Sequence, residues 1–389
     1  MTADDLPHEA YVAALACLDG VGPARLRWLL GSGPPREVWD RVLAGRLAAD
    51  RTAVEVGATA QLRSAWRSQA AALSPAEIWH RCADAGIGVV TLGSAGYPPA
   101  LAQDIDPPVV LFQRGDPDAL AGPCVAVIGT RRATGYGRRH AAELGRSLSE
   151  CGVAVVSGLA LGIDAAAHEG ATATVGAPPV AVVGSGLDAP CPRRNHALAG
   201  RVAERGVLLS EVPPGVRAAP WRFPVRNRVI AAVAQAVVVV ESAGAGGSMH
   251  TVREALARDR PVLAVPGPID SRASEGTNQL IADGAVLCAR VDDVLLAIDH
   301  VVPRAASEQG VLPLDQRREP RGDAAVVLEG LGWGPTSVER LAVSSGLAFG
   351  PLAAALVQLE SDGWIERNGG WIERVARSGR VPGTAGEPA

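Results

Sequence analysis

Short apolar runs recur along the middle of the chain, separated by stretches with helical periodicity. We expect nine strands, at residues 89–92, 109–113, 125–128, 154–157, 180–183, 207–209, 237–240, 262–265 and 285–288. Helices fit between most of them, for example at 195–205, 228–234 and 248–258. Strands that are apolar on both faces and alternate with helices predict a parallel sheet covered on both sides. Residues 75–300 are therefore expected to form one doubly wound α/β domain.

The two flanks of this domain have different patterns. Residues 1–72 place leucines near helical spacing, and the break at 19–26, DGVGPARL, resembles the turn of a helix-hairpin-helix or SAM-like domain; a plain glycine turn remains open. Residues 303–322 carry proline, glycine and charge without periodicity, which is typical of a linker. Residues 323–376 follow the order helix, helix, helix, hairpin, which resembles a winged helix. The last residues, 377–389, are expected to be disordered.

The third helix of a winged helix usually enters the major groove of duplex DNA. Here that helix is FGPLAAALVQLESDG, which has no arginine and ends in acidic residues. We therefore expect the winged helix to contact protein or to pack, and not to bind duplex DNA through this helix.

Composition excludes several functions. The net charge of -4 argues against a globally basic DNA-binding protein, although a locally basic groove is still possible. All 37 basic residues are arginine, so no Schiff-base lysine and no P-loop lysine exist. The six cysteines show no metal-ligand spacing, the N-terminus does not resemble a signal peptide, and no apolar run reaches membrane-spanning length. We expect a soluble cytoplasmic protein.

Glycine-rich polar loops follow six of the expected strands. They begin at residues 129 (GTRRATGYG), 157 (SGLALGID), 184 (GSGLDAPCPRRN), 210 (SEVPPG, continued by WRFPVRNR from 221), 241 (ESAGAGGSMHT) and 266 (PGPIDS). In a doubly wound fold such loops converge on the carboxyl edge of the sheet. The first loop lies between a strand and a helix N-terminus, where free N–H groups and the helix dipole favour an anion.

Arginine on these loops is suited to phosphate, because its planar fork pairs with phosphate oxygens. Each arginine alone is more simply a solvated surface residue, but three pairs on one edge indicate an anion groove. The candidate DNA-binding residues are Arg131, Arg132, Ser157, Gly158, Arg193, Arg194, Asn195, Arg226, Asn227 and Arg228. For the two asparagines, helix capping is the simpler role.

The sequence gives less support for dinucleotide binding or for catalysis. The turn G-T-R lacks the G-x-G-x-x-G fingerprint, and the second strand ends without an acid, so a dinucleotide site is rejected. Asp164 and His168 lie at i, i+4, which is compatible with a general base and more simply with an ion pair on a helix face. No nucleophile elbow occurs. We expect no catalytic residue, no metal and no cofactor.

The loops as a set resemble the DNA-processing protein DprA (Smf) family. The resemblance spans about residues 98–285 and includes GTRRATGYG, VSGLALGIDAAAH, GSGLDAPCPRRN, FPVRNRVIAAV, GGSMHT and GTNQLIADGA. It implies an extended Rossmann domain that binds single-stranded DNA in the cytoplasm, self-association as a homodimer, and loading of the RecA recombinase in natural transformation and recombination. It also implies a small N-terminal helical domain and a C-terminal winged helix. By this resemblance the phosphate-binding arginine is Arg131, the third-loop cation is Arg193, and Arg226–Arg228 form the R-N-R motif.

The chain departs from the family pattern at two positions. Leu161 stands where many relatives carry lysine, and Cys191 stands where an aromatic often precedes the third-loop proline. The second change removes a surface for base stacking, which is worth about 1–3 kcal/mol per base. Tyr136, Trp221 and Phe223 remain as candidates for stacking, although each could equally serve the core.

Two other functions stay open. Rossmann-like nucleoside-monophosphate phosphoribohydrolases carry P-G-G-x-G-T-x-x-E, and the nearest match, GGSMHTVRE, would make Glu254 the catalytic acid in a shifted frame. A scaffold that binds only protein is the other alternative.

Overall fold

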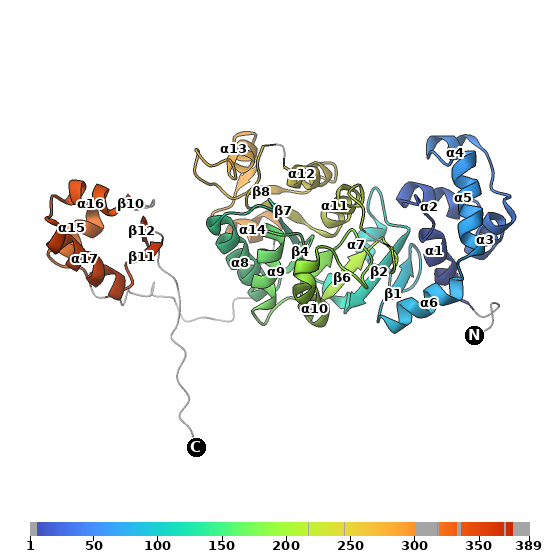
Figure 1. Ribbon diagram of the computed structural model, residues 1–389, viewed down its shortest axis with the longest axis horizontal. Coiled ribbons are helices and arrows are strands. Elements are labelled where there is room, and N and C mark those ends of the chain that lie inside the picture. Colours follow the sequence, from blue (N-terminus) through green and yellow to red (C-terminus); the bar gives the residue numbers. More distant parts are fainter. Residues whose placement is uncertain are drawn as a thin grey trace, which may run out of the picture. The chain divides into compact units, whose positions relative to one another are not determined.

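The computed structural model describes residues 6–216, 218–244, 246–299, 317, 319–332, 336–368 and 371–375. The chain divides into two compact units, Met1–Val302 and Pro303–Ala389, and each is described by itself (Figure 1). Of the predicted linker, residues 303–316 and 318 lie outside the described residues, and so does the whole predicted tail, 377–389. Of the helices that the structure describes, none alone is long and apolar enough to cross a membrane; α16 (Val338–Ser345) and α17 (Phe349–Ser361) meet that test only as a pair bent by 111°.

A nine-stranded sheet forms the centre of the first unit. Its strands are β1 (Gly88–Thr91), β2 (Val110–Gly115), β3 (Cys124–Ile128), β4 (Ala154–Ser157), β5 (Val180–Val182), β6 (Val207–Ser210), β7 (Ala236–Val239), β8 (Val262–Ala264) and β9 (Val286–Leu287). All nine predicted strands are confirmed, with their ends shifted by up to two residues. The order is β1-β2-β6-β5-β4-β3-β7-β8-β9.

The sheet is parallel from β6 to β9, as predicted, but β2 runs antiparallel to both of its neighbours, β1 and β6. Between β1 and β2 the chain has only one short helix, α7 (Pro99–Ala102), and not the long crossover helix that usually joins parallel strands. Strand order reverses beside β3: β4, β5 and β6 follow on one side, and β7, β8 and β9 lie on the other. The loops after β3 and β7 therefore meet at the topological switch point.

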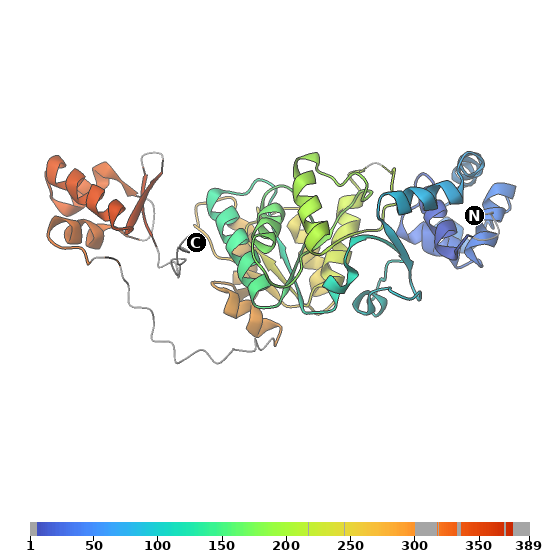
Figure 2. The same cartoon turned by 90° about the horizontal axis from the view of Figure 1, so that it is seen from below.

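Helices cover both faces of the sheet (Figures 1 and 2). On one face α8 (Gly135–Glu150), α9 (Ile163–Thr172) and α14 (Val291–Ala297) share a core with Val125 and Val127 of β3. On the other, α11 (Arg222–Val233), α12 (Ser248–Leu256) and α13 (Glu275–Ala282) share a core with Ala126 and Ile128. Alternate residues of β3 thus enter opposite cores, as strand geometry requires.

Six helices precede the sheet. They are α1 (His8–Ala16), α2 (Pro23–Leu30), α3 (Pro35–Ala44), α4 (Arg51–Glu55), α5 (Ala60–Ala71) and α6 (Pro75–Asp84). Their core is continuous with Val89 and Phe112 of the sheet and with α10 (His196–Arg205). The turn at 19–26 packs against the α/β domain, because a Cβ on Gly22 would lie 3.4 Å from the Trp221 ring. This packing favours the plain-turn interpretation of DGVGPARL.

The second unit is a winged helix, as predicted. Its described elements are α15 (Asp323–Gly330), β10 (Thr336–Ser337), α16, α17, β11 (Ile365–Asn368) and β12 (Trp371–Arg374), with strand order β10-β12-β11. Ser337 caps α16, since its hydroxyl accepts a hydrogen bond from the Arg340 N–H at 3.4 Å, and Gly346 ends that helix in the left-handed conformation.

Candidate nucleic-acid interface

A hollow of 590 Å³ lies at the switch point of the sheet. Its walls come from the loop after β3, the loop after β7, the start of α12 and the first turns of α11. Four of the predicted DNA-binding residues line it: Arg131, Arg132, Arg226 and Asn227. Gly246 and Gly247 of the β7–α12 loop line it as well. The structure thus brings cations and exposed backbone together where ligands of doubly wound sheets bind.

A smaller hollow of 90 Å³ adjoins the first and shares four of its residues: Arg131, Ala160, Phe223 and Arg226. Predicted Gly158 lines this smaller hollow, as do Leu161 and Cys191. The two departures from the family pattern therefore fall together and leave the smaller hollow mostly apolar. Pro192 lines it too, and the exposed Arg193 and Arg194 follow directly in the chain, on the 3-10 turn Arg193–Asn195.

The expected anion site at the N-terminus of α8 is already filled by the protein itself. The Glu241 carboxylate, at the end of β7, accepts hydrogen bonds from the Thr134 N–H at 2.9 Å and from its hydroxyl at 2.5 Å. That hydroxyl accepts a hydrogen bond from the Gly137 N–H at 3.1 Å. A carboxylate of the chain itself thus lies where the sequence predicts an anion, and Arg131 and Arg132 of the preceding turn line the larger hollow.

Arg131 is held over an aromatic ring. Its guanidinium carbon lies 5.2 Å from the centroid of the Phe223 ring, within the range of a cation–π contact. Phe223 lines both hollows. The other two aromatic candidates lie elsewhere: the Tyr136 hydroxyl donates to the Pro266 carbonyl at 2.7 Å, and Trp221 packs beside Gly22 with the Arg222 guanidinium over it. Phe223 is thus the candidate that the structure places at the site.

Arg226 is buried and holds the edge of the sheet together. Its Nη1 donates to the Gly158 carbonyl at 2.7 Å, after β4, and to the Val182 carbonyl at the end of β5. Only 7% of the residue is exposed, and burial lowers its pKa to about 10. A Cβ on Gly158 would lie 2.3 Å from this guanidinium, so a side chain there would displace Arg226. Arg226 therefore positions the loops and presents little charge to solvent.

Two further predicted residues position the loop after β4 and do not line either hollow. The Ser157 hydroxyl donates to the Val127 carbonyl at 2.6 Å. The Asn195 side-chain amide donates to the Leu159 carbonyl at 2.8 Å, next to a backbone that takes the left-handed conformation at Leu159 (φ 54°). Asn195 does not cap α10 with its side chain, contrary to the simpler role suggested above. Both residues are buried.

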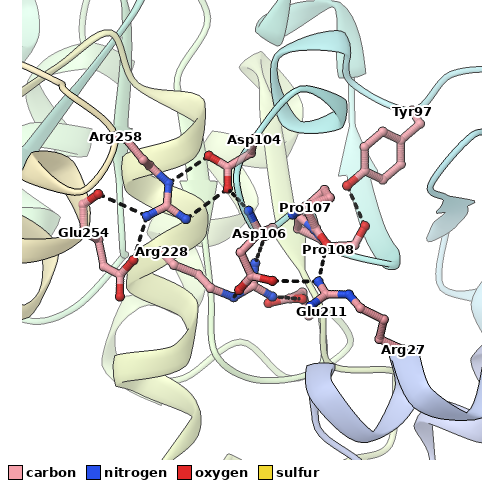
Figure 3. Close-up of polar contacts among 10 residues, drawn as sticks. All are labelled: Arg27, Tyr97, Asp104, Asp106, Pro107, Pro108, Glu211, Arg228, Glu254 and Arg258. Carbon is pink, nitrogen blue, oxygen red and sulfur yellow. Dashed lines mark hydrogen bonds and ion pairs between the residues drawn. The ribbon is translucent and has the colours of Figure 1, made fainter.

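Arg228, predicted from the sequence as a DNA contact, lines neither hollow. Figure 3 shows its guanidinium between Asp106 and Glu211, with ion-pair distances of 3.2 Å and 2.5 Å. Arg27 of α2 also pairs with Asp106, at 2.7 Å. Burial is the main cause that raises the pKa of Glu211, to about 7. The motif R-N-R was placed on a loop, but α11 begins at Arg222, and helical geometry turns Arg226 and Arg228 in different directions.

The Asp164–His168 pair is neither an exposed ion pair nor an assembled catalytic pair. The Asp164 carboxylate accepts the Gly158 N–H at 3.1 Å, and burial raises its pKa against the opposing effect of Arg226. His168 is fully buried, and burial lowers its pKa to about 4, so the ring is neutral. Among the described residues no group of three or more His, Cys, Asp or Glu side chains could hold a metal ion.

Residues 88–299 match the family model "DNA recombination-mediator protein A", and residues 313–370 match "DprA winged helix domain". The chain belongs to the DprA family. It is 42% identical to the putative DNA processing protein DprA of Mycobacterium tuberculosis over 282 residues, which cover 70% of each chain. It is 36% identical to the protein Smf of Escherichia coli over 301 residues, 75% of this chain and 79% of that one. The DprA assignment made from the loops is confirmed.

Two solved structures agree. The X-ray structure of DprA from Streptococcus pneumoniae has a TM-score of 0.61 at 29% identity, covering 75% of this chain and 98% of that one. The DprA of Helicobacter pylori, whose structure is described as revealing a single-stranded DNA binding mode, has a TM-score of 0.50 at 31% identity, covering 56% of this chain and 99% of that one.

Proposed function

We propose that this protein is a DNA-processing factor that binds single-stranded DNA at the switch-point hollow, without breaking bonds. The observation that carries the proposal is the convergence of Arg131, Arg132 and the Phe223 ring in one hollow. A binder of unpaired strands needs cations along a groove and planar faces for bases, and this set supplies both. The DprA of Helicobacter pylori, a relative of known structure, is described as binding single-stranded DNA.

The test is a titration of a single-stranded oligonucleotide at several salt concentrations. Arg131→Ala should weaken binding and flatten the slope of log affinity against log salt by about 0.7, the value for one phosphate of a single strand. Arg201→Ala is the matched control, because Arg201 is an exposed arginine of α10 that lines neither hollow. Equal affinities and slopes for both variants would refute the assignment of the site.

We propose that the bound strand is handed to the RecA recombinase. The family name, recombination mediator, supports this role. Strand exchange by RecA, on single strands coated with the cognate single-strand-binding protein, should start earlier when the protein is added. The Arg131→Ala variant should not accelerate it. Acceleration by the variant equal to that of the wild type would show that the hollow is not used in loading.

We propose that the protein self-associates through the β9 edge of the sheet. Val286 and Leu287 of this edge strand are 48% and 46% exposed, and Leu296 of the nearby α14 is 79% exposed. Unpaired apolar edges are uncommon in monomers, because they invite pairing with another chain. Light scattering should give a dimer for the wild type and a monomer for Leu287→Arg. A monomeric wild type at micromolar concentration would contradict this proposal.

The phosphoribohydrolase alternative is less well supported. It needs Glu254 at the hollow, but Glu254 does not line it; its carboxylate pairs with Arg258 at 2.6 Å (Figure 3). Incubation with AMP should therefore release no adenine. Release of adenine that is lost in Glu254→Gln would restore this alternative.

A further inference from the structure

The N-terminus of α8 is the place where a doubly wound fold normally receives a ligand phosphate. It follows β3, the strand at the switch point, and its helix dipole favours negative charge. In this protein a carboxylate of the chain occupies that place.

Glu241 is held there by hydrogen bonds to its backbone and to its side chain. Its backbone carbonyl accepts the Thr130 N–H at 2.7 Å, which ties the end of β7 to the loop after β3. Its side chain holds the Thr134 N–H and hydroxyl, and the residue is only 1% exposed. The side chain also lies against the first turn of the helix, because a Cβ on Gly137 would lie 2.2 Å from a Glu241 carboxylate oxygen. An entering phosphate would have to displace this group or lie against its charge.

We propose that Glu241 is a specificity-determining residue: it excludes nucleotide and dinucleotide phosphates from the α8 N-terminus. Anion recognition is thereby left to Arg131 and Arg132, which line the wider hollow, where a polymer can pass. Charge repulsion in a buried site and the loss of the carboxylate hydrogen bonds both oppose a terminal phosphate or pyrophosphate. This inference goes beyond the proposed function, since it concerns mononucleotides and holds whether or not the protein binds single strands.

The experiment measures ADP and inorganic pyrophosphate binding to the full chain by calorimetry. Glu241→Ser shortens the side chain and leaves space for an anion at the Thr134 N–H. Glu241→Gln is the matched control, because the amide keeps the bulk and one acceptor and still fills the space. ADP should bind Glu241→Ser at least about tenfold more tightly than either the wild type or Glu241→Gln, a change that corresponds to about 1.4 kcal/mol.

A folded Glu241→Ser protein, as judged by circular dichroism, that binds ADP no better than the wild type would overturn the proposal. If this variant does not fold, the wild type provides the test. Backbone amide NMR signals of Thr134 and Gly137 should not shift when pyrophosphate is added at millimolar concentration; shifts confined to these amides would overturn the proposal. Binding of single-stranded oligonucleotides is measured in separate titrations. The ADP and pyrophosphate results can therefore be interpreted even if the protein does not bind single-stranded DNA.

Discussion

Burial decides what each arginine of the family motifs does. Arg131 lines the hollow at the surface, whereas Arg228, with 6% of its surface exposed, is enclosed between two carboxylates. A guanidinium in water is free to meet a phosphate, but one enclosed by acids is a structural cation whose loss leaves those acids unpaired. Substitution of arginine should therefore impair DNA binding at position 131 and stability at position 228.

Arg228→Gln should destabilise the first unit strongly. Removing one partner of a buried ion pair costs about 3–5 kcal/mol, because the other charge stays buried without compensation. Thermal unfolding should show a large fall in midpoint, whereas Arg194→Gln, at an exposed position, should change it little. The folded fraction of Arg228→Gln should bind oligonucleotide with wild-type affinity. Wild-type stability with lost binding would instead make Arg228 a DNA contact.

The buried His168 should titrate far below an ordinary histidine. Its pKa of about 4 in the folded state lies below the value of about 6.5 in an unfolded chain, so the unfolded state binds the extra proton more readily. Its contribution to stability is therefore present above pH 6.5 and is lost as the pH falls toward 4. The His168 ring signal in the NMR spectrum of the wild type can be assigned because it is missing from the spectrum of His168→Gln. The chemical shift of this signal should not change between pH 8 and 5.5. A midpoint near 6.5 would contradict the burial seen here.

At the scale of elements, the contact between β7 and α8 organises the site. Thr134 and Glu241 are 107 residues apart in the chain, yet the Glu241 carboxylate, just after β7, accepts hydrogen bonds from Thr134, whose hydroxyl caps α8. This contact requires glycine's lack of a side chain at position 137, because a Cβ there would collide with the Glu241 carboxylate. Glycine in the first turn of a helix is thus explained by close packing and not by backbone conformation.

Gly137→Ala should destabilise the protein by about 1–3 kcal/mol, the cost of forcing extra atoms into a packed site. Gly135→Ala is the matched control in the same helical turn, since a Cβ there would meet nothing within 4 Å. Urea unfolding followed by circular dichroism should separate the two variants. Equal midpoints would mean that the Glu241 side chain moves aside at little cost.

At the scale of the whole molecule, the two units have separate hydrophobic cores. The winged helix buries Val327, Leu341, Leu352 and Leu359 in its own cluster, and every residue that lines the two hollows belongs to the first unit. Single-strand binding should therefore not depend on the winged helix.

A chain ending at Val302 should bind a single-stranded oligonucleotide within about threefold of the full chain, a difference below 1 kcal/mol. Residues 320–376 alone should not bind duplex DNA, because α17 carries no arginine. Fluorescence anisotropy checks both statements. Micromolar duplex binding by the winged helix with a steep salt dependence would refute the second one.

The sequence by itself determined the order of the strands along the chain, the helices between them, the winged helix and the family. Those features depend on local periodicity and on motifs such as G-T-R, which can be read over a few residues. It also placed Arg131 and Arg132 at the site, because a turn between a strand and a helix at the switch point leaves its side chains at the edge of the sheet.

Only the tertiary structure decided the roles that depend on partners far away in the chain. Glu241 fills the end of a helix that begins at Gly135, Asn195 supports the backbone at Leu159, and Arg228 pairs with Asp106. No spacing in the sequence reports such pairings, because each is formed by strand order and helix rotation. The rotation of α11 about its axis directs Arg226 toward the edge of the sheet and Arg228 toward Asp106. This rotation follows from packing and cannot be deduced from the R-N-R motif.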